Sequence, residues 1–127
     1  MSSGSGRKQE AAEEIVHTII RSLKERIGRG PEGYRTYLVD DLLVVRLLRD
    51  LTPVEYEQAK TPAGRKSIKD TRNRLIQDLR PSLQDRIKHL TGANVISVHS
   101  DLSTRTGERI IIFVLDRRVA DIFGEHG

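Results

Sequence analysis

The sequence predicts an α+β fold built from two αββ repeats, in which four mostly antiparallel strands form one sheet and two main helices pack on one of its faces. Three observations lead to this prediction. Apolar residues recur at three- and four-residue steps in segments 9–27 and 62–90, as in amphipathic helices. Two short runs rich in Val, Ile and Leu follow each segment, as in β-hairpins. The second set resembles the first at an offset of sixty residues.

The sixty-residue offset is first visible in SLKERI at 22–27 and SLQDRI at 82–87. Any two amphipathic helices can be aligned on their apolar stripes, so the helix match alone carries little weight. The match continues past a glycine into the strands, where Leu38 falls on Val98, and this favours a duplication. The matched helix positions are Ile15 and Leu75, Val16 and Ile76, Ile19 and Leu79, Leu23 and Leu83, and Ile27 and Ile87.

The first repeat is expected at about 9–51, after a disordered N-terminal tip at 1–8. Its helix ends at Gly28, because glycine readily takes the left-handed conformation that closes a helix. A hairpin follows at 34–51. Asp40 and Asp41 form its turn, so that Val39 pairs with Leu42.

Two Thr-Pro pairs mark the next helix starts, because Thr caps a helix and Pro suits its first position. Thr52-Pro53 predicts a short connecting helix at 53–60, and Thr61-Pro62 a long helix that continues through Pro81 with a kink there. The second repeat, at about 62–116, ends in a hairpin of strands 94–102 and 108–115, with Ile96 and Val98 on one face. The single domain spans 9–123, with a final helical turn or two from 117 and a loose tail at 124–127.

The strand pattern predicts that the second face of the sheet is too apolar to be left in water. A second copy of the chain is the simplest cover, with the C-terminal segment as the alternative. The residues of this expected dimer face are Val39, Leu42, Val44, Ile110, Ile112 and Val114.

Composition narrows the possible functions. The 127-residue chain has a net charge of +4 with interspersed signs, so nucleic-acid binding is a weak expectation, even for the basic segment RKSIKDTRNR at 65–74. It has no cysteine, which excludes disulfides and thiolate sites and fits the reducing cytosol. No apolar run is long enough to span a membrane. We therefore expect a cytoplasmic protein.

Polar residues on the strands suggest a small-anion site. His99 and Asp101 share one strand face, and Arg35 and Tyr37 share the corresponding face of the other hairpin. Such a cluster could bind an anion or move a proton. The simpler interpretation is a polar rim around a dimer interface. The candidate ligand-binding residues are Arg29, Arg35, Tyr37, His99, Asp101 and Arg105.

Signatures of catalysis are scarce. GRGPEG at 28–33 follows a helix rather than a strand and lacks the end of a phosphate-binding loop. The four histidines do not pair at metal-ligand spacing. We expect no enzyme, no metal and no cofactor.

Three segments carry a family resemblance. They are GRGPEGYRTYLVDDLLVVRL, LTPVEYEQAKTPAGRKSIKDTR and LTGANVISVHSDLSTRTGERIIIFVL. Together they resemble the C subunit of the Na+-translocating membrane-potential-generating system, a former domain-of-unknown-function family of small bacterial proteins. The resemblance implies an association with membrane potential and inorganic-carbon uptake, and related domains occur beside signalling proteins.

Three functions follow as hypotheses. The first is a non-enzymatic accessory or regulatory homodimer that acts on a membrane transport complex or a signalling partner. The second is a sensor of a small anion such as bicarbonate or a nucleotide. The third is a nucleic-acid-binding protein that uses the basic long helix.

Overall fold

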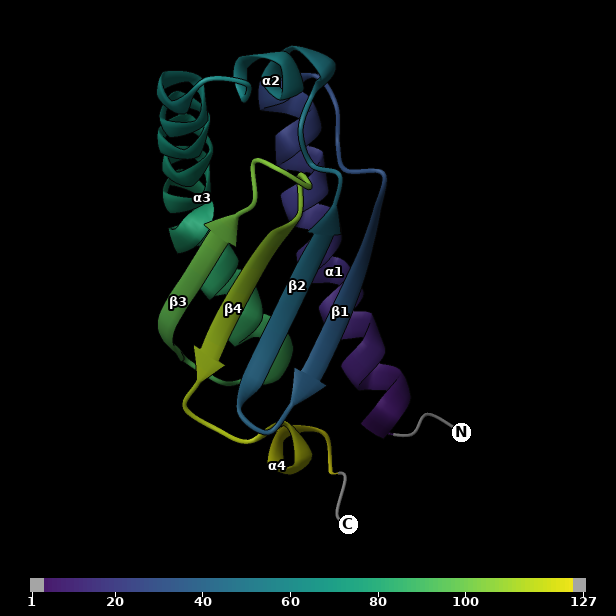
Figure 1. Ribbon diagram of the computed structural model, residues 1–127. Helices are drawn as coiled ribbons and strands as arrows, with labels where there is room; N and C mark the ends of the chain where they lie inside the picture. Colours follow the sequence, from purple (N-terminus) through teal and green to yellow (C-terminus); the bar gives the residue numbers. More distant parts are fainter. Residues whose placement is uncertain (1–3, 125–127) are drawn as a thin grey trace.

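The structure, a computed structural model, describes residues 4–124 and has the predicted α+β architecture. Four antiparallel strands form one sheet, and the two long helices lie behind it (Figure 1). The elements in chain order are α1 (Gly4–Ile27), β1 (Gly33–Val39), β2 (Leu42–Leu48), α2 (Pro53–Gln58), α3 (Pro62–Thr91), β3 (Val95–Leu102), β4 (Arg109–Leu115) and α4 (Val119–Phe123).

The sheet has the strand order β1-β2-β4-β3, so each hairpin contributes one central and one edge strand. The predicted turn is confirmed: Asp40 has a φ of 57°, and Val39 pairs with Leu42. β2 and β4 join the hairpins in the middle of the sheet, where Val45 lies beside Ile111. A helix followed by two strands therefore occurs twice, which is consistent with two αββ repeats.

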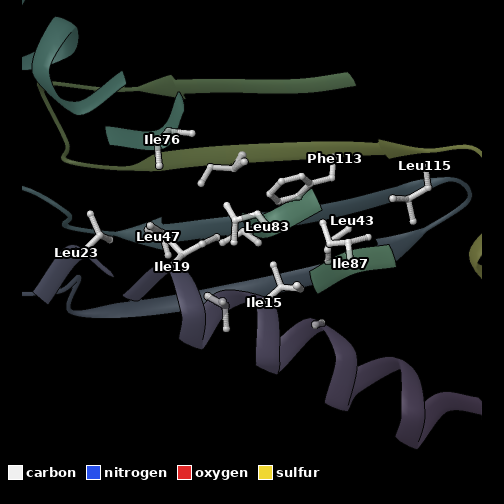
Figure 2. Packing of buried hydrophobic residues seen from close by; sticks show 14 of the residues in the cluster. Ile15, Ile19, Leu23, Leu43, Leu47, Ile76, Leu83, Ile87, Phe113 and Leu115 are labelled. Atoms are coloured by element: carbon white, nitrogen blue, oxygen red, sulfur yellow. The ribbon is translucent and has the colours of Figure 1, made fainter. Parts of the chain in front are cut away.

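The main core lies between the sheet and the two long helices (Figure 2). Alternate residues of β2 and β4 face the helices and are buried, as the period-two pattern predicts. The core is aliphatic except for Phe113, which is completely buried. Its labelled members in Figure 2 are Ile15, Ile19, Leu23, Leu43, Leu47, Ile76, Leu83, Ile87, Phe113 and Leu115.

The Thr-Pro helix starts are also confirmed. Thr52 forms a capping box with Glu55 at the start of α2, and the Thr61 hydroxyl accepts a hydrogen bond from the Gly64 N–H at the start of α3. α3 continues through Pro81 and ends at Gly92, which has a φ of 76°. The kink at Pro81 stays a prediction.

Two details differ from the sequence prediction. α1 begins at Gly4, so residues 4–8 are helical rather than part of a disordered tip, whereas 1–3 lie outside the described residues.

A bulge between Val95 and Ser97 shifts the register of β3, so Val95 packs on the core and Ile96 is 63% exposed. Alternation predicts Ile96 on the same face as Val98 and Val95 on the opposite face. Both assignments were wrong, because strict alternation fails across a bulge.

The C-terminal segment lies on the helix side of the molecule. Val119 and Phe123 of α4 form a small apolar cluster with Ala11 of α1. The described part of this segment therefore leaves the front of the sheet open in Figure 1. Within residues 4–124, no helix combines the length and apolar character needed to cross a membrane.

Candidate functional site

The sheet face away from α1 and α3, called the outer face below, is open to solvent and apolar at its centre (Figure 1). The paired residues run across all four strands in three rows. The first row is Arg35, Arg46, Ile110 and Asp101; the middle row is Tyr37, Val44, Ile112 and His99; the third row is Val39, Leu42, Val114 and Ser97.

All six residues predicted for the dimer face lie in these rows. Five of them are half-buried by their neighbours, and Val39 on the edge strand is 56% exposed. Five also occupy the two central strands, next to one another across the β2–β4 pairing. A continuous apolar patch on an otherwise charged surface is typical of an interaction site.

The predicted anion cluster does not form. Arg35 and Tyr37 lie on edge strand β1, whereas His99 and Asp101 lie on the opposite edge strand, β3. Three strand spacings separate the two pairs, which is roughly 14 Å. The hairpins join through β2 and β4, and this pairing sends the polar residues to opposite edges.

The polar residues at these edges have local partners. His99 Nε2 is 3.2 Å from Ser97 Oγ, and Lys69 Nζ is 3.4 Å from a carboxylate oxygen of Asp101. Asp101 nevertheless keeps 83% of its side-chain surface exposed. The β3 edge is slightly hollowed on the outer face, in a depression lined by His99, Asp101, Ile110 and Ile112.

Arg29 and Arg105 lie outside the outer face. Arg29 is in the loop between α1 and β1, and Arg105 is exposed in the loop between β3 and β4. The positive charge of Arg29 contributes to the field at Asp50, where it opposes a rise in the pKa. The six candidate ligand residues therefore do not line one pocket.

A buried charge cluster, formed by Asp50, Arg72, Arg109 and Glu55, lies at the end of the sheet nearest α2. The first three are at most 3% exposed. Arg72 donates two hydrogen bonds to the Glu55 carboxylate, at 2.9 and 2.7 Å, and one to the Asp50 carbonyl at 2.7 Å. Two arginines and two carboxylates are equal in number, and opposite charges offset part of the cost of burying each other.

Asp50 lies between the two arginines without a close side-chain contact to either. One of its carboxylate oxygens is 3.7 Å from Arg72 Nη1 and 3.9 Å from Arg109 Nε, and this oxygen has no hydrogen-bond partner. Burial raises the pKa of Asp50 to about 6, although both arginines oppose the rise. Glu55 differs: burial alone would raise its pKa, but the Arg72 and Thr52 hydrogen bonds bring it below the usual value.

The cluster joins segments that are far apart in the chain. The Asp50 N–H donates to the Gly107 carbonyl at 2.7 Å, and Arg109 Nη1 donates to Ser100 Oγ at 2.7 Å. The Glu55 carboxylate has two roles, because it accepts a hydrogen bond from the Thr52 N–H at the start of α2 and another from Arg72. These contacts hold α2, α3 and the ends of β2 and β4 together.

Sequence reasoning missed this cluster, although a signal was present. Arg72 falls on the apolar stripe of α3, four residues after Ile68 and three before Leu75. Arg109 occupies the helix-facing phase of β4, two residues before Ile111. A charged residue at a core position indicates a buried partner of opposite charge.

The comparisons with known proteins agree with the three segments that carry the resemblance. A family model described as Na+-translocating membrane potential-generating system (MpsC) matches residues 7–117. The chain belongs to this family. The MpsC match takes in both repeats, the outer face and the buried charge cluster.

Two curated relatives come from Bacillus subtilis (strain 168). The chain is 40% identical over 102 residues to "Uncharacterized protein YbcI", and the aligned segment covers 80% of this chain and 82% of YbcI. It is 35% identical over 103 residues to "Uncharacterized protein YrhF", and the aligned segment covers 80% of this chain and 84% of YrhF. No solved structure matches the chain significantly.

Proposed function

We propose that this MpsC-family chain is a non-enzymatic, cytoplasmic accessory or regulatory protein, and that it works as a homodimer with a membrane-potential or inorganic-carbon transport system. The family description supports the link to a membrane-potential system. The observation that carries the proposal is the outer face, whose apolar centre is uncovered in residues 4–124. A protein that functions by association needs such a surface.

The other two hypotheses receive less support from the geometry. The anion sensor required Arg35, His99 and Asp101 to converge, and they lie at opposite edges of the sheet. The nucleic-acid hypothesis required free cations on the long helix. Three of the five cations in segment 65–74 are engaged within the chain: Lys66 pairs with Asp70, Lys69 pairs with Asp101, and Arg72 is buried. Arg65 and Arg74 are exposed.

The proposal is tested in the native host with the substitution Val44→Glu at the centre of the outer face. We expect the variant to fold and to lose its association with membrane-system proteins. We also expect the variant and a deletion of the gene to change membrane potential in the same direction, read with a potential-sensitive dye. Val54→Glu is the matched control, because Val54 is 68% exposed on α2, which lies beyond the end of the sheet (Figure 1). Normal membrane potential in both the deletion and the Val44 variant would contradict the proposal.

A further inference from the structure

The outer face carries opposite charges at opposite ends of one row. In the first row Arg35 lies on edge strand β1 and Asp101 on edge strand β3, and the middle row ends in Tyr37 and His99. The apolar residues occupy the centre between these edges. Such a pattern can match a second copy of itself, depending on how the copy is turned.

Two identical faces can pack against each other only about a two-fold axis that lies in the plane between them. For aligned sheets the axis runs either along the strands or across them. An axis along the strands, between β2 and β4, exchanges β1 with β3 and keeps each row opposite itself. An axis across the strands keeps each strand opposite itself and exchanges the first and third rows.

The axis along the strands places opposite charges over each other and apolar residues over apolar residues. Arg35 then lies over the partner's Asp101, and Val44 over the partner's Ile112. The exposed ring of Tyr37, which is 46% accessible, lies over the depression at the partner's His99. Each of these contacts occurs twice in the dimer. Arg46 lies over an isoleucine, but its charge is already paired with Glu108 at 2.6 Å.

The axis across the strands gives a poorer match. Tyr37 and His99 would each lie over their own copies, and Arg35 would lie over the partner's Val39. Neither Arg35 nor Asp101 would meet an opposite charge. Charge complementarity selects the orientation of an interface more strongly than it adds affinity, so it favours the axis along the strands.

We propose that two copies of this chain pack outer face to outer face about a two-fold axis parallel to the strands, with Arg35 of each copy paired with the partner's Asp101. The inference rests on the homodimer of the proposed function and specifies its geometry. The apolar centre provides the affinity, and the two Arg35–Asp101 pairs fix the orientation. Asp101 can accept Arg35 without leaving Lys69, because most of its surface is free.

The absence of cysteine allows a direct test of the geometry. Tyr37→Cys and His99→Cys are made as separate proteins, mixed, and treated with a short bis-maleimide. We expect a cross-linked dimer from the mixture and little from either protein alone, since position 37 faces position 99 of the partner. Cross-linking of each protein with itself would instead indicate the axis across the strands. A monomeric mass of the wild type by light scattering at micromolar concentration would overturn the dimer altogether.

A charge exchange tests the pairs themselves. Arg35→Asp and Asp101→Arg should each weaken dimerisation roughly tenfold in Kd, because each leaves like charges opposed twice. The double variant should restore most of the wild-type Kd. Arg86→Asp is the control, because Arg86 pairs with Glu14 of its own chain on the helix side. If the double variant were as weak as the sum of the single ones, the pairing would be wrong.

The outcomes separate this inference from the proposed function. If the dimer forms with another geometry and Val44→Glu still changes membrane potential, only the inference fails. If no dimer forms, the homodimer of the proposed function fails with it, even where Val44→Glu changes membrane potential. If the cross-links form as expected but neither deletion nor Val44→Glu has an effect in the host, the geometry stands and the proposed function fails.

Discussion

At the scale of single residues, the buried charge cluster is the least ordinary feature of the chain. Arg72 and Arg109 occupy core-facing positions of α3 and β4, where the helix and strand patterns predict apolar side chains. Burying a charge is costly unless a partner compensates it, and removal of one partner from a buried pair typically costs about 3–5 kcal/mol. Asp50 and Glu55 therefore have to reach the same site from the β2–α2 segment.

Asp50 should make the stability of the protein depend on pH. Its pKa is about 6 in the folded state, above the ordinary 3.8, so the folded chain binds the proton more tightly than the unfolded chain. This contribution is fully present below pH 4 and is lost as the pH rises through 6. A shift of this size corresponds to at most about 3 kcal/mol.

Urea unfolding of the wild type and of Asp50→Asn between pH 4 and 7 measures this contribution. The free energy of unfolding of the wild type, relative to the variant, should fall as the pH rises. Asp70→Asn, at an exposed ion pair with Lys66, is the matched control for the loss of a carboxylate. A relative stability that grows with pH would mean that the arginines, rather than burial, dominate the pKa of Asp50.

At the scale of elements, the junction of α2 and α3 is closely packed at Gly64. An added Cβ at Gly64 would lie 1.8 Å from the Gln58 carbonyl oxygen, which is backbone and cannot move away cheaply. The two helices can therefore approach only with glycine at this position. This junction places Glu55 of α2 against Arg72 of α3.

Gly64→Ala should lower the free energy of unfolding by about 1–3 kcal/mol, the usual cost of forcing atoms into a packed site. Thermal unfolding followed by circular dichroism measures the change. Gly6→Ala is the matched control in α1, where an added Cβ meets nothing within 4 Å and helix propensity favours alanine. Equal stability of the Gly64 variant and the wild type would show that the junction relaxes without cost.

At the scale of the whole molecule, the two αββ repeats share one core. Ile15 and Ile19 of the first repeat and Leu83 and Ile87 of the second belong to the same apolar cluster. The central pairing of the sheet, between β2 and β4, also joins the repeats. A helix with an isolated hairpin buries too little apolar surface to be stable alone.

Fragments 1–60 and 61–127, made separately, should therefore show little stable structure, and an equimolar mixture should regain far-UV circular dichroism close to that of the intact chain. The division falls between α2 and α3, so no helix or strand is cut. A cooperative thermal transition in either fragment alone would contradict the shared core.

Much of the fold could be predicted because the relevant information is local. Helix stripes, Thr-Pro starts and the Asp-Asp turn depend on neighbours within a few residues, and the structure confirms them. The apolar face of six residues followed from strand alternation. The bulge at Ile96 did not, because a bulge breaks alternation without changing composition.

The sequence by itself determined the elements, their order and, except at the bulge of β3, which strand residues share a face, since periodicity and turn chemistry act over short distances. Only the tertiary structure decided the strand order, and with it the outcome for the candidate site. Pairing of β2 with β4 sent Arg35 and His99 to opposite edges, where they cannot form a pocket but can match a second copy. The same pairing brought Asp50 to Arg109, because contacts between distant segments depend on how whole elements pack.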